Sequence, residues 1–448
     1  MKVVVIGSGS IFFTRRMVLG MAHSPILHNA ELVLVDTNEH KCREMGRFCQ
    51  KINESCGGSI RITWTTDRLE ALPGSDYVIL SFAIRNYHYR ETGTTLSKLY
   101  GINVISGETA GPSAVFRILR TVPVILRVAA DIERLCPGAL VINYVNPTNV
   151  IGTALQRFTK LRSYAFCDGM YEIDGPAIAQ YLGVPRMSWA ELTGRYAMKM
   201  GGINHFTFLW ELRQGEHDLW QQFRSGLERC AKTEGIQSDR GGEWEFVRTL
   251  DAWPTQFYHT AEYVRFFQGK GSQPARDNCC ERWSLNKRIR WYRQVWKAIE
   301  DCNAGRITVE QAITDQSTDM VAALIESIEG DQGRIFPVNV RNDGRIPNLP
   351  SDTMIEVLGA FCRDRVDLAQ VGPLPRGLAG LILPSIEEQE LALEAAMTGN
   401  FRTIVKAVAA DPLVMSFRDA EDLAREFMAL EENDLDHNLD HYWLNAEP

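Results

Sequence analysis

The chain of 448 residues carries 45% hydrophobic and 23% charged residues and a net charge of −8, a composition typical of a globular protein. Its length exceeds that of one ordinary core, so we expect two domains, at residues 1–194 and 195–448. The acidic balance without a basic block argues against a nucleic-acid partner, and the absence of an apolar run of about 20 residues argues against a membrane span, so a cytoplasmic location is expected.

The first 36 residues have the order strand, glycine turn, helix, strand and acid. The β-branched run at residues 3–6 is typical of a strand buried on both faces of a sheet. A helix is predicted over Ile11–Ala22, and a second strand at residues 31–35 ends at Asp36. This order predicts the α/β class with a parallel sheet.

The turn and the acid suit a dinucleotide. The positive end of a helix dipole holds a pyrophosphate, and the glycines of the Gly7-Ser8-Gly9-Ser10 turn let the backbone approach it. Asp36 is placed to accept both hydroxyls of an adenosine ribose, which favours NAD over NADP. The third glycine of the usual fingerprint is replaced by Phe12, so an ordinary strand–helix–strand unit remains the alternative.

Polar residues follow three of the later strands, which are predicted at residues 60–64, 77–82, 140–145 and 163–166. Arg85 and Arg90 follow the second of these, at the edge where open sheets bind ligands; a solvated loop and helix start is an equal alternative. Asn146 follows the third, although Asn-Pro is also a common turn. The fourth leads into Cys167 and Asp168.

The second half of the chain is predicted to mix helices and strands. A helical region is expected after residues 201–207 and up to about Arg290, and another over Gly305–Glu329. A short strand is expected at residues 338–340. A capping box at residues 385–388 predicts the start of a helix that runs toward Ala410.

Cys167 and His205 are the candidate metal ligands, since a thiolate and an imidazole suit a divalent transition metal. The alternatives are a buried cysteine and a structural histidine. Asp168 is a candidate general acid or a turn residue. Tyr258 is a candidate base or a packed aromatic residue, with His259 as its rival. The ten cysteines lack a regular spacing, so free thiols are expected.

Taken together, these segments resemble the NAD- and manganese-dependent glycosidases of glycoside hydrolase family 4, from Met1 to about Val414. The motifs that carry the resemblance are Val5-Ile6-Gly7-Ser8-Gly9-Ser10, Gly111-Pro112 with Phe116–Thr121, Asn143 with Asn146-Pro147, Cys167-Asp168, Gly202-Ile203-Asn204-His205, and Val338-Asn339 through Asn348-Leu349-Pro350 to Glu356-Val357. The resemblance implies an N-terminal Rossmann-like sheet, as in lactate and malate dehydrogenases, and a C-terminal mixed α+β catalytic domain.

The resemblance also implies a mechanism unlike the two-carboxylate route of most glycosidases. NAD takes hydride from C3 of the sugar, a base removes the C2 proton, the glycosidic oxygen leaves, water adds at C1 and the hydride returns. Mn2+ or another divalent metal stabilises the enolate. The family assembles as homodimers or homotetramers.

Residue by residue, the resemblance assigns the metal to Cys167 and His205 and the acid to Asp168, with Tyr258 as the candidate base and His259 as its rival. It places Asn146 against the substrate, close to the nicotinamide. The residues that match the NAD site are Gly7, Gly9, Ser10, Thr14 and Asp36.

The motifs match no single substrate subgroup of the family. Cys167-Asp168 resembles the 6-phospho-α-glucosidases, but their proline two residues after the aspartate is absent, and Gly111-Pro112-Ser113-Ala114 replaces the usual Gly-Pro-Gly-Gly. We expect a small-molecule glycoside, an α-hexoside, with Arg85 and Arg90 as candidates for binding a phosphate, carboxylate or sulfonate substituent. The alternatives are an NAD-dependent 2-hydroxyacid dehydrogenase and a non-catalytic sensor of NAD or sugar.

Overall fold

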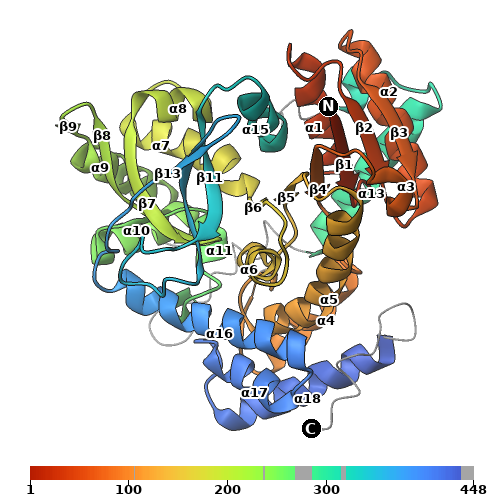
Figure 1. Ribbon diagram of the computed structural model, residues 1–448. Helices are drawn as coiled ribbons and strands as arrows, with labels where there is room; N and C mark the ends of the chain where they lie inside the picture. The colour runs from red at the N-terminus through yellow and green to blue at the C-terminus, as the bar shows by residue number, and fades with distance from the viewer. Residues whose placement is uncertain (105, 236–237, 268–284, 314–318, 435–448) are drawn as a thin grey trace.

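The structure is a computed structural model that describes residues 1–104, 106–235, 238–267, 285–313 and 319–434. One continuous sheet runs through it in the order β10-β8-β7-β12-β11-β6-β5-β4-β1-β2-β3, with β13 on β12 and β9 on β8 (Figure 1). The strands are β1 (Lys2–Ile6), β2 (Glu31–Val35), β3 (Arg61–Thr65), β4 (Tyr77–Leu80), β5 (Leu140–Asn143), β6 (Ser163–Ala165), β7 (Ala197–Ile203), β8 (Phe206–Gln214), β9 (His217–Asp218), β10 (Trp253–Pro254), β11 (Arg334–Arg341), β12 (Met354–Phe361) and β13 (Val366–Leu368).

Helices cover both halves of this sheet. They are α1 (Thr14–His23), α2 (Glu39–Ser55), α3 (Arg68–Ala71), α4 (Asn86–Leu99), α5 (Pro112–Leu135), α6 (Thr148–Phe158), η1 (Met170–Asp174), α7 (Gly175–Leu182), α8 (Trp189–Arg195), α9 (Trp220–Glu234), α10 (Asp239–Leu250), α11 (Phe257–Thr260), η2 (Arg265–Phe267), α13 (Leu285–Asn303), α14 (Val309–Ala312), α15 (Met320–Glu329), α16 (Leu378–Thr398), α17 (Phe401–Ala410) and α18 (Phe417–Asp434). None of the helices in the described ranges combines the length and the apolar character that crossing a membrane requires.

Six parallel strands form the first half of the sheet, in the order β3-β2-β1-β4-β5-β6. Val3 to Ile6 of β1 and all four residues of β4 are buried, as expected for strands with helices on both faces. This strand order is that of a doubly wound dinucleotide-binding sheet. The prediction of an N-terminal Rossmann-like sheet is therefore confirmed.

The second half of the sheet is antiparallel and joins the first without a break. Asn339 of β11 pairs with Ala165 of β6, and Glu356 of β12 pairs with Gly202 of β7. The turn between β7 and β8 is thereby brought close to the end of β6. The domain boundary expected near residue 194 falls within α8 and remains a prediction.

Two predictions for the second half are wrong. Residues 206–214 form strand β8, not a helix, because β7 and β10 pair on either side of it; part of the expected helical region, residues 268–284, lies outside the described residues. Residues 385–388 do not open a helix, because α16 already begins at Leu378 and contains Pro384. The break comes instead at Gly399, with φ 66°, and at Asn400, which caps α17.

Other elements differ only in their bounds. The helix expected over Gly305–Glu329 consists of α14 and α15, and residues 314–318 between them lie outside the description. The strand expected at residues 338–340 is part of the longer strand β11, Arg334–Arg341. All eight described cysteines carry free thiols, as expected.

The last three helices return to the first half of the molecule. Figure 1 shows α16, α17 and α18 below the sheet, next to α4 and α5. The rings of Phe116 in α5 and Phe427 in α18 stack at 4.5 Å. Glu388 of α16 and Asp411, which follows α17, are both buried here. Burial raises the pKa of Asp411 to about 6 and, with the Asp411 carboxyl close by, holds the pKa of Glu388 well above its usual range.

Glu388→Gln is expected to stabilise the protein above pH 6. In the folded chain both acids hold their protons to a higher pH than in the unfolded chain, so stability falls as the pH rises from about 4 through the raised pKa values. A glutamine removes one titrating acid and donates to the Asp411 carboxylate. A thermal scan should show a melting temperature about 2–4 °C above wild type at pH 8 and no gain at pH 4. An equal gain at both pH values would contradict this explanation.

Candidate active site

The glycine turn after β1 brings the expected NAD-binding residues together. Gly7 has φ 97°, and a Cβ there would lie 2.4 Å from the carbonyl oxygen of Ser81, so only glycine fits. Helix α1 begins at Thr14, three residues later than predicted, and the Thr14 hydroxyl donates to the Ser8 carbonyl at 2.8 Å. Asp36 accepts from the Gly9 N–H at 2.8 Å. The turn is thus built for close backbone approach at the carboxyl edge of the sheet.

Cys167 and His205 meet at the junction of the two halves. Cys167 follows β6, and His205 lies in the turn between β7 and β8 with φ 66°. The Cys167 Sγ lies 3.2 Å from His205 Nε2. The other ring nitrogen, Nδ1, lies 3.1 Å from the Thr109 hydroxyl oxygen. The His259 ring stacks on the His205 ring at 3.9 Å, with an interplanar angle of 2°.

The surroundings favour the uncharged forms of both groups. Burial, and after it the charge of Glu356, raise the pKa of the Cys167 thiol. Burial and His259 hold the pKa of His205 well below its usual range. A neutral imidazole is the form that ligates a metal, and a metal would have to displace the proton from the thiol.

The spacing of the pair fits a divalent metal. With metal–sulfur and metal–nitrogen bonds of about 2.3 and about 2.1 Å, a right angle at the metal separates the two ligand atoms by about 3.1 Å. The 3.2 Å between Cys167 Sγ and His205 Nε2 is close to this value. Within the described ranges, no group of three or more His, Cys, Asp or Glu side chains forms a metal cage. A metal held by this pair would retain positions for substrate oxygens.

Glu108 connects several of the expected substrate-binding residues. It pairs with Arg90 at 3.0 Å and accepts from the Asn146 side-chain amide at 3.3 Å. Burial opposes its ionisation, but the charges of Arg90, Arg117 and Arg288 outweigh burial and hold the pKa of Glu108 below its usual range. Arg117 also donates to the Asn146 carbonyl at 3.2 Å. Glu108 therefore contacts Arg90 and Asn146 and lies within the electrostatic influence of Arg117 and Arg288.

Arg85 differs from Arg90 in its surroundings. It precedes α4 with φ 40°, is exposed, and places its guanidinium 5.7 Å from the centre of the Tyr89 ring. Arg90, in contrast, is 5% exposed. The two arginines that the sequence placed together thus have different surroundings.

Asp168 lies in a different buried cluster from the Cys167–His205 pair. Its neighbours are Asp319 at the start of α15, Arg16 of α1 and Tyr144 after β5. Burial is the main cause that raises the pKa of Asp168. Arg16 also pairs with Glu172 of η1. The cluster joins the nucleotide-binding half to the second half close to the metal-binding candidates.

Tyr258 and His259 lie side by side in α11, with ring centres 4.5 Å apart. The His259 Nδ1 is 3.4 Å from a carboxylate oxygen of Glu262, and its ring covers His205. Tyr258 interacts electrostatically with Arg288 of α13. His259 thus contacts Glu262 and His205, whereas Tyr258 interacts with Arg288.

Several residues of the site were not identified from the sequence. Glu108 and Thr109 lie in the glycine-rich loop before α5, where no role was assigned to them. For Glu262, the sequence offered one signal, an acidic residue within the aromatic segment from Phe257 to Phe267. The structure shows that this residue is buried. Arg288 stands among several basic residues at the start of α13, and nothing in the sequence distinguishes it from them.

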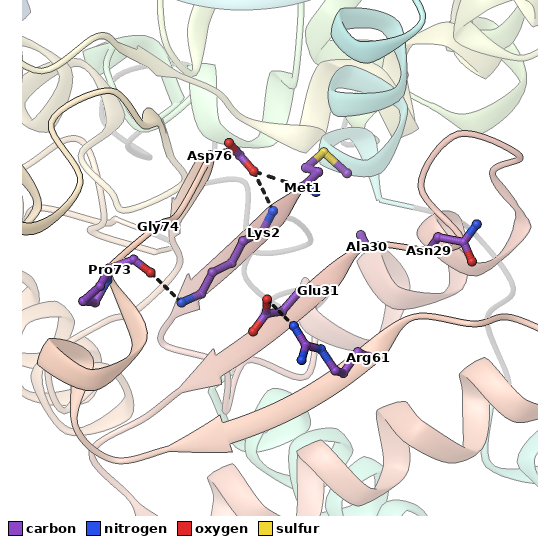
Figure 2. A pocket seen from close by; sticks show the side chains of 9 residues that line it. All are labelled: Met1, Lys2, Asn29, Ala30, Glu31, Arg61, Pro73, Gly74 and Asp76. Atoms are coloured by element: carbon purple, nitrogen blue, oxygen red, sulfur yellow. Dashed lines mark hydrogen bonds and ion pairs between the residues drawn. The ribbon is translucent and has the colours of Figure 1, made fainter.

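A separate hollow lies at the opposite, amino edge of the parallel strands (Figure 2). Its charged residues are already engaged: Lys2 Nζ donates to the Pro73 carbonyl at 2.8 Å, and Glu31 pairs with Arg61 at 2.6 Å. Open α/β sheets bind their ligands at the carboxyl edge. The hollow therefore does not compete with the Cys167–His205 region.

Comparison with known proteins identifies relatives over the whole length of the chain. A protein of Bacillus subtilis named "Probable 6-phospho-beta-glucosidase" is 28% identical over 437 residues, which is 96% of each chain. An alpha-galactosidase of the same organism is 26% identical over 92% of this chain and 93% of its own. The fold matches a 6-phospho-alpha-glucosidase from gut microorganisms, crystallised with NAD and Mn2+, with a TM-score of 0.80 and 18% identity over 96% of this chain and 98% of that chain.

Two family models match as well. The model for family 4 glycosyl hydrolases covers residues 2–183, and the model for the C-terminal domain of the same family covers residues 200–414. Together they span most of the chain and both halves of the sheet. The chain therefore belongs to the family 4 glycosyl hydrolases.

Proposed function

We propose that this chain is a glycosidase that depends on NAD and a divalent metal, with Mn2+ as the metal. The observation that carries the proposal is the Cys167–His205 pair at 3.2 Å, beside the carboxyl edge of a sheet with a dinucleotide-binding turn. Family membership argues against a 2-hydroxyacid dehydrogenase. The relative crystallised with NAD and Mn2+ shares the fold.

Each cofactor has residues in this chain that fit it. When bound, NAD would exchange a hydride with the sugar, and the metal would polarise sugar oxygens. Cys167 and His205 would hold the metal. The turn that contains Gly7, Gly9, Ser10 and Thr14 would hold the pyrophosphate, and Asp36 the ribose.

The remaining roles fall to polar residues around the pair. Asn146, held by Glu108 and Arg117, would orient the sugar. Tyr258 would remove the C2 proton, since His259 is engaged with Glu262 and His205. Asp168 would protonate the leaving oxygen from the cluster beside Cys167. With these assignments, Asp168 would serve as the acid and Tyr258 as the base of the reaction.

We further propose that the sugar carries an anionic substituent. Three guanidinium groups, those of Arg90, Arg117 and Arg288, act on the single carboxylate of Glu108. This positive excess suits a phosphate, carboxylate or sulfonate group on a hexoside. Arg85 is exposed before α4 and has different surroundings, so we assign the substituent to these three guanidinium groups.

Arg288→Ala is expected to lower kcat/KM for anionic glycosides by about 10- to 100-fold, because a hydrogen bond to a charged group contributes about 1.5–3 kcal/mol. The loss for neutral glycosides should be smaller and should come only from the interaction of Arg288 with Tyr258. Arg293→Ala is the matched control, since Arg293 is exposed on the same helix. The measurement is kcat/KM for each substrate with each variant. An equal loss for neutral and anionic substrates would remove Arg288 from recognition of the substituent.

A panel of nitrophenyl glycosides tests the function itself. Neutral, uronic, 6-phosphorylated and 6-sulfonated sugars are each tested with and without NAD and Mn2+ under reducing conditions, with nitrophenol and NADH read together. Release of nitrophenol that requires both cofactors, without accumulation of NADH, would support the proposal and identify the sugar class. Accumulation of NADH without cleavage would indicate a dehydrogenase, and binding of NAD without any turnover would indicate a sensor.

We also propose that the protein is cytoplasmic and assembles as a homodimer or homotetramer. The resemblance to family 4 enzymes supports the oligomer, and the use of NAD supports a location where that cofactor is abundant. Light scattering after size-exclusion chromatography would measure the oligomeric state.

A further inference from the structure

Glu262 stands at the centre of a buried hydrogen-bond network beside the Cys167–His205 pair. Its side chain is fully buried. It accepts from the Ser106 N–H, from the Ser106 hydroxyl at 2.8 Å and from the Gly107 N–H at 3.3 Å. Its second oxygen lies 3.4 Å from His259 Nδ1. A buried carboxylate is tolerated only with such partners, so these contacts fix the loop before α5 against the end of α11.

Two routes lead from this carboxylate to His205. The first runs along the loop, two residues past Gly107, to Thr109, whose hydroxyl oxygen lies 3.1 Å from His205 Nδ1. The second runs through His259, whose ring lies flat on the His205 ring at 3.9 Å. A ring that is bonded at Nδ1 and covered on one face resists rotation. Its Nε2 therefore stays directed at Cys167 Sγ.

We propose that Glu262 is a positioning residue for the metal site: by holding the 106–107 loop and His259, it fixes the His205 ring with Nε2 toward Cys167. This inference rests on the proposed function, because it concerns how the Cys167–His205 pair would hold a metal. Glu262 contacts Ser106, Gly107 and His259, so it acts on His205 through other residues. Outer-shell partners of this kind change metal affinity by about 10- to 100-fold.

The test measures Mn2+ affinity by titration with electron paramagnetic resonance, and NAD affinity by fluorescence, on the full chain. Glu262→Gln replaces one carboxylate oxygen with an amide N–H2. If this group faces the backbone N–H groups of Ser106 and Gly107, both contacts are lost, and if it faces the Ser106 hydroxyl and His259 Nδ1, these groups must accept instead of donate. We expect a fall of about 10- to 100-fold in Mn2+ affinity with unchanged NAD affinity, and recovery of kcat at saturating Mn2+. Thr109→Val should weaken Mn2+ binding too and add little to Glu262→Gln, because both act on the same ring.

Glu243→Gln is the matched control. Glu243 is 3% exposed and accepts from Tyr181 at 2.6 Å, Trp253 at 2.8 Å and Arg240 at 2.7 Å. It therefore loses comparable buried contacts in a different apolar cluster. We expect it to lower the melting temperature while Mn2+ affinity stays at the wild-type value.

The outcomes separate this inference from the proposed function. Wild-type Mn2+ affinity in Glu262→Gln, or an equal loss in Glu262→Gln and Glu243→Gln, overturns the positioning role alone. Absence of Mn2+ binding in the wild-type chain overturns the proposed function and the inference with it. If Glu262→Gln does not fold, Ser106→Ala decides, since it removes the hydroxyl that donates to Glu262 and accepts from the Glu108 N–H at 3.4 Å but keeps the carboxylate. Unchanged Mn2+ affinity in that variant then overturns the role.

Discussion

Replacing Cys167 with serine is expected to abolish metal-dependent glycoside cleavage while NAD binding persists. A thiolate is a strong metal ligand, and a serine hydroxyl at the same position, 3.2 Å from His205 Nε2, stays neutral and binds weakly. Loss of an outer-shell partner already costs up to about 100-fold in metal affinity, so loss of a direct ligand should cost more. The quantities to measure are Mn2+ affinity, and kcat/KM with the substrate that the glycoside panel selects.

Cys136→Ser provides the control for this result. Cys136 is a buried thiol that directly follows α5 and packs in an apolar cluster of the nucleotide-binding half. Its replacement should leave Mn2+ affinity and turnover close to wild type. Unchanged Mn2+ affinity in Cys167→Ser would remove Cys167 from the metal site, and a parallel loss of NAD affinity would indicate general unfolding instead.

The parallel half of the fold could be predicted because its information is local. Strands β1 and β2 are short apolar runs, and the turn and helix α1 between them leave few ways to connect two parallel strands. The antiparallel half depends on distant partners. Residues 206–214 pair on one side with β7, which is separated from them by only two residues and was missed as a local hairpin, and on the other side with the distant β10. Such pairing overrides local propensity.

The sequence allowed several residues of the candidate site to be named, but it did not allow their contacts in space to be predicted. Cys167 and His205 are brought together by the path of the sheet, from β6 through β11 and β12 to β7, which the sequence does not reveal. Glu108 and Glu262 act through partners far along the chain, and a carboxylate of this kind has no local pattern. Asp168 followed the predicted strand, but its neighbour Asp319 comes from the other half of the chain.

Replacing Tyr258 with phenylalanine is expected to lower kcat by about 100- to 10,000-fold, the range for loss of a general base. The hydroxyl is the only group removed, so the α11 backbone and the stack of His259 on His205 should remain. Mn2+ and NAD affinities should therefore stay at wild-type values. The decisive measurement is the rate at which solvent deuterium enters C2 of the sugar, read by proton NMR, because that rate reports removal of the C2 proton.

His259→Gln distinguishes the two rivals for the base. His259 donates toward Glu262 and covers His205, so its loss should weaken Mn2+ binding yet permit C2 exchange once Mn2+ is saturating. The reverse pattern, with exchange lost in His259→Gln and kept in Tyr258→Phe, would assign the base to His259. It would also mean that a ring stacked on a metal ligand moves during turnover, because the Nδ1 contact with Glu262 would then have to break or serve as a proton path.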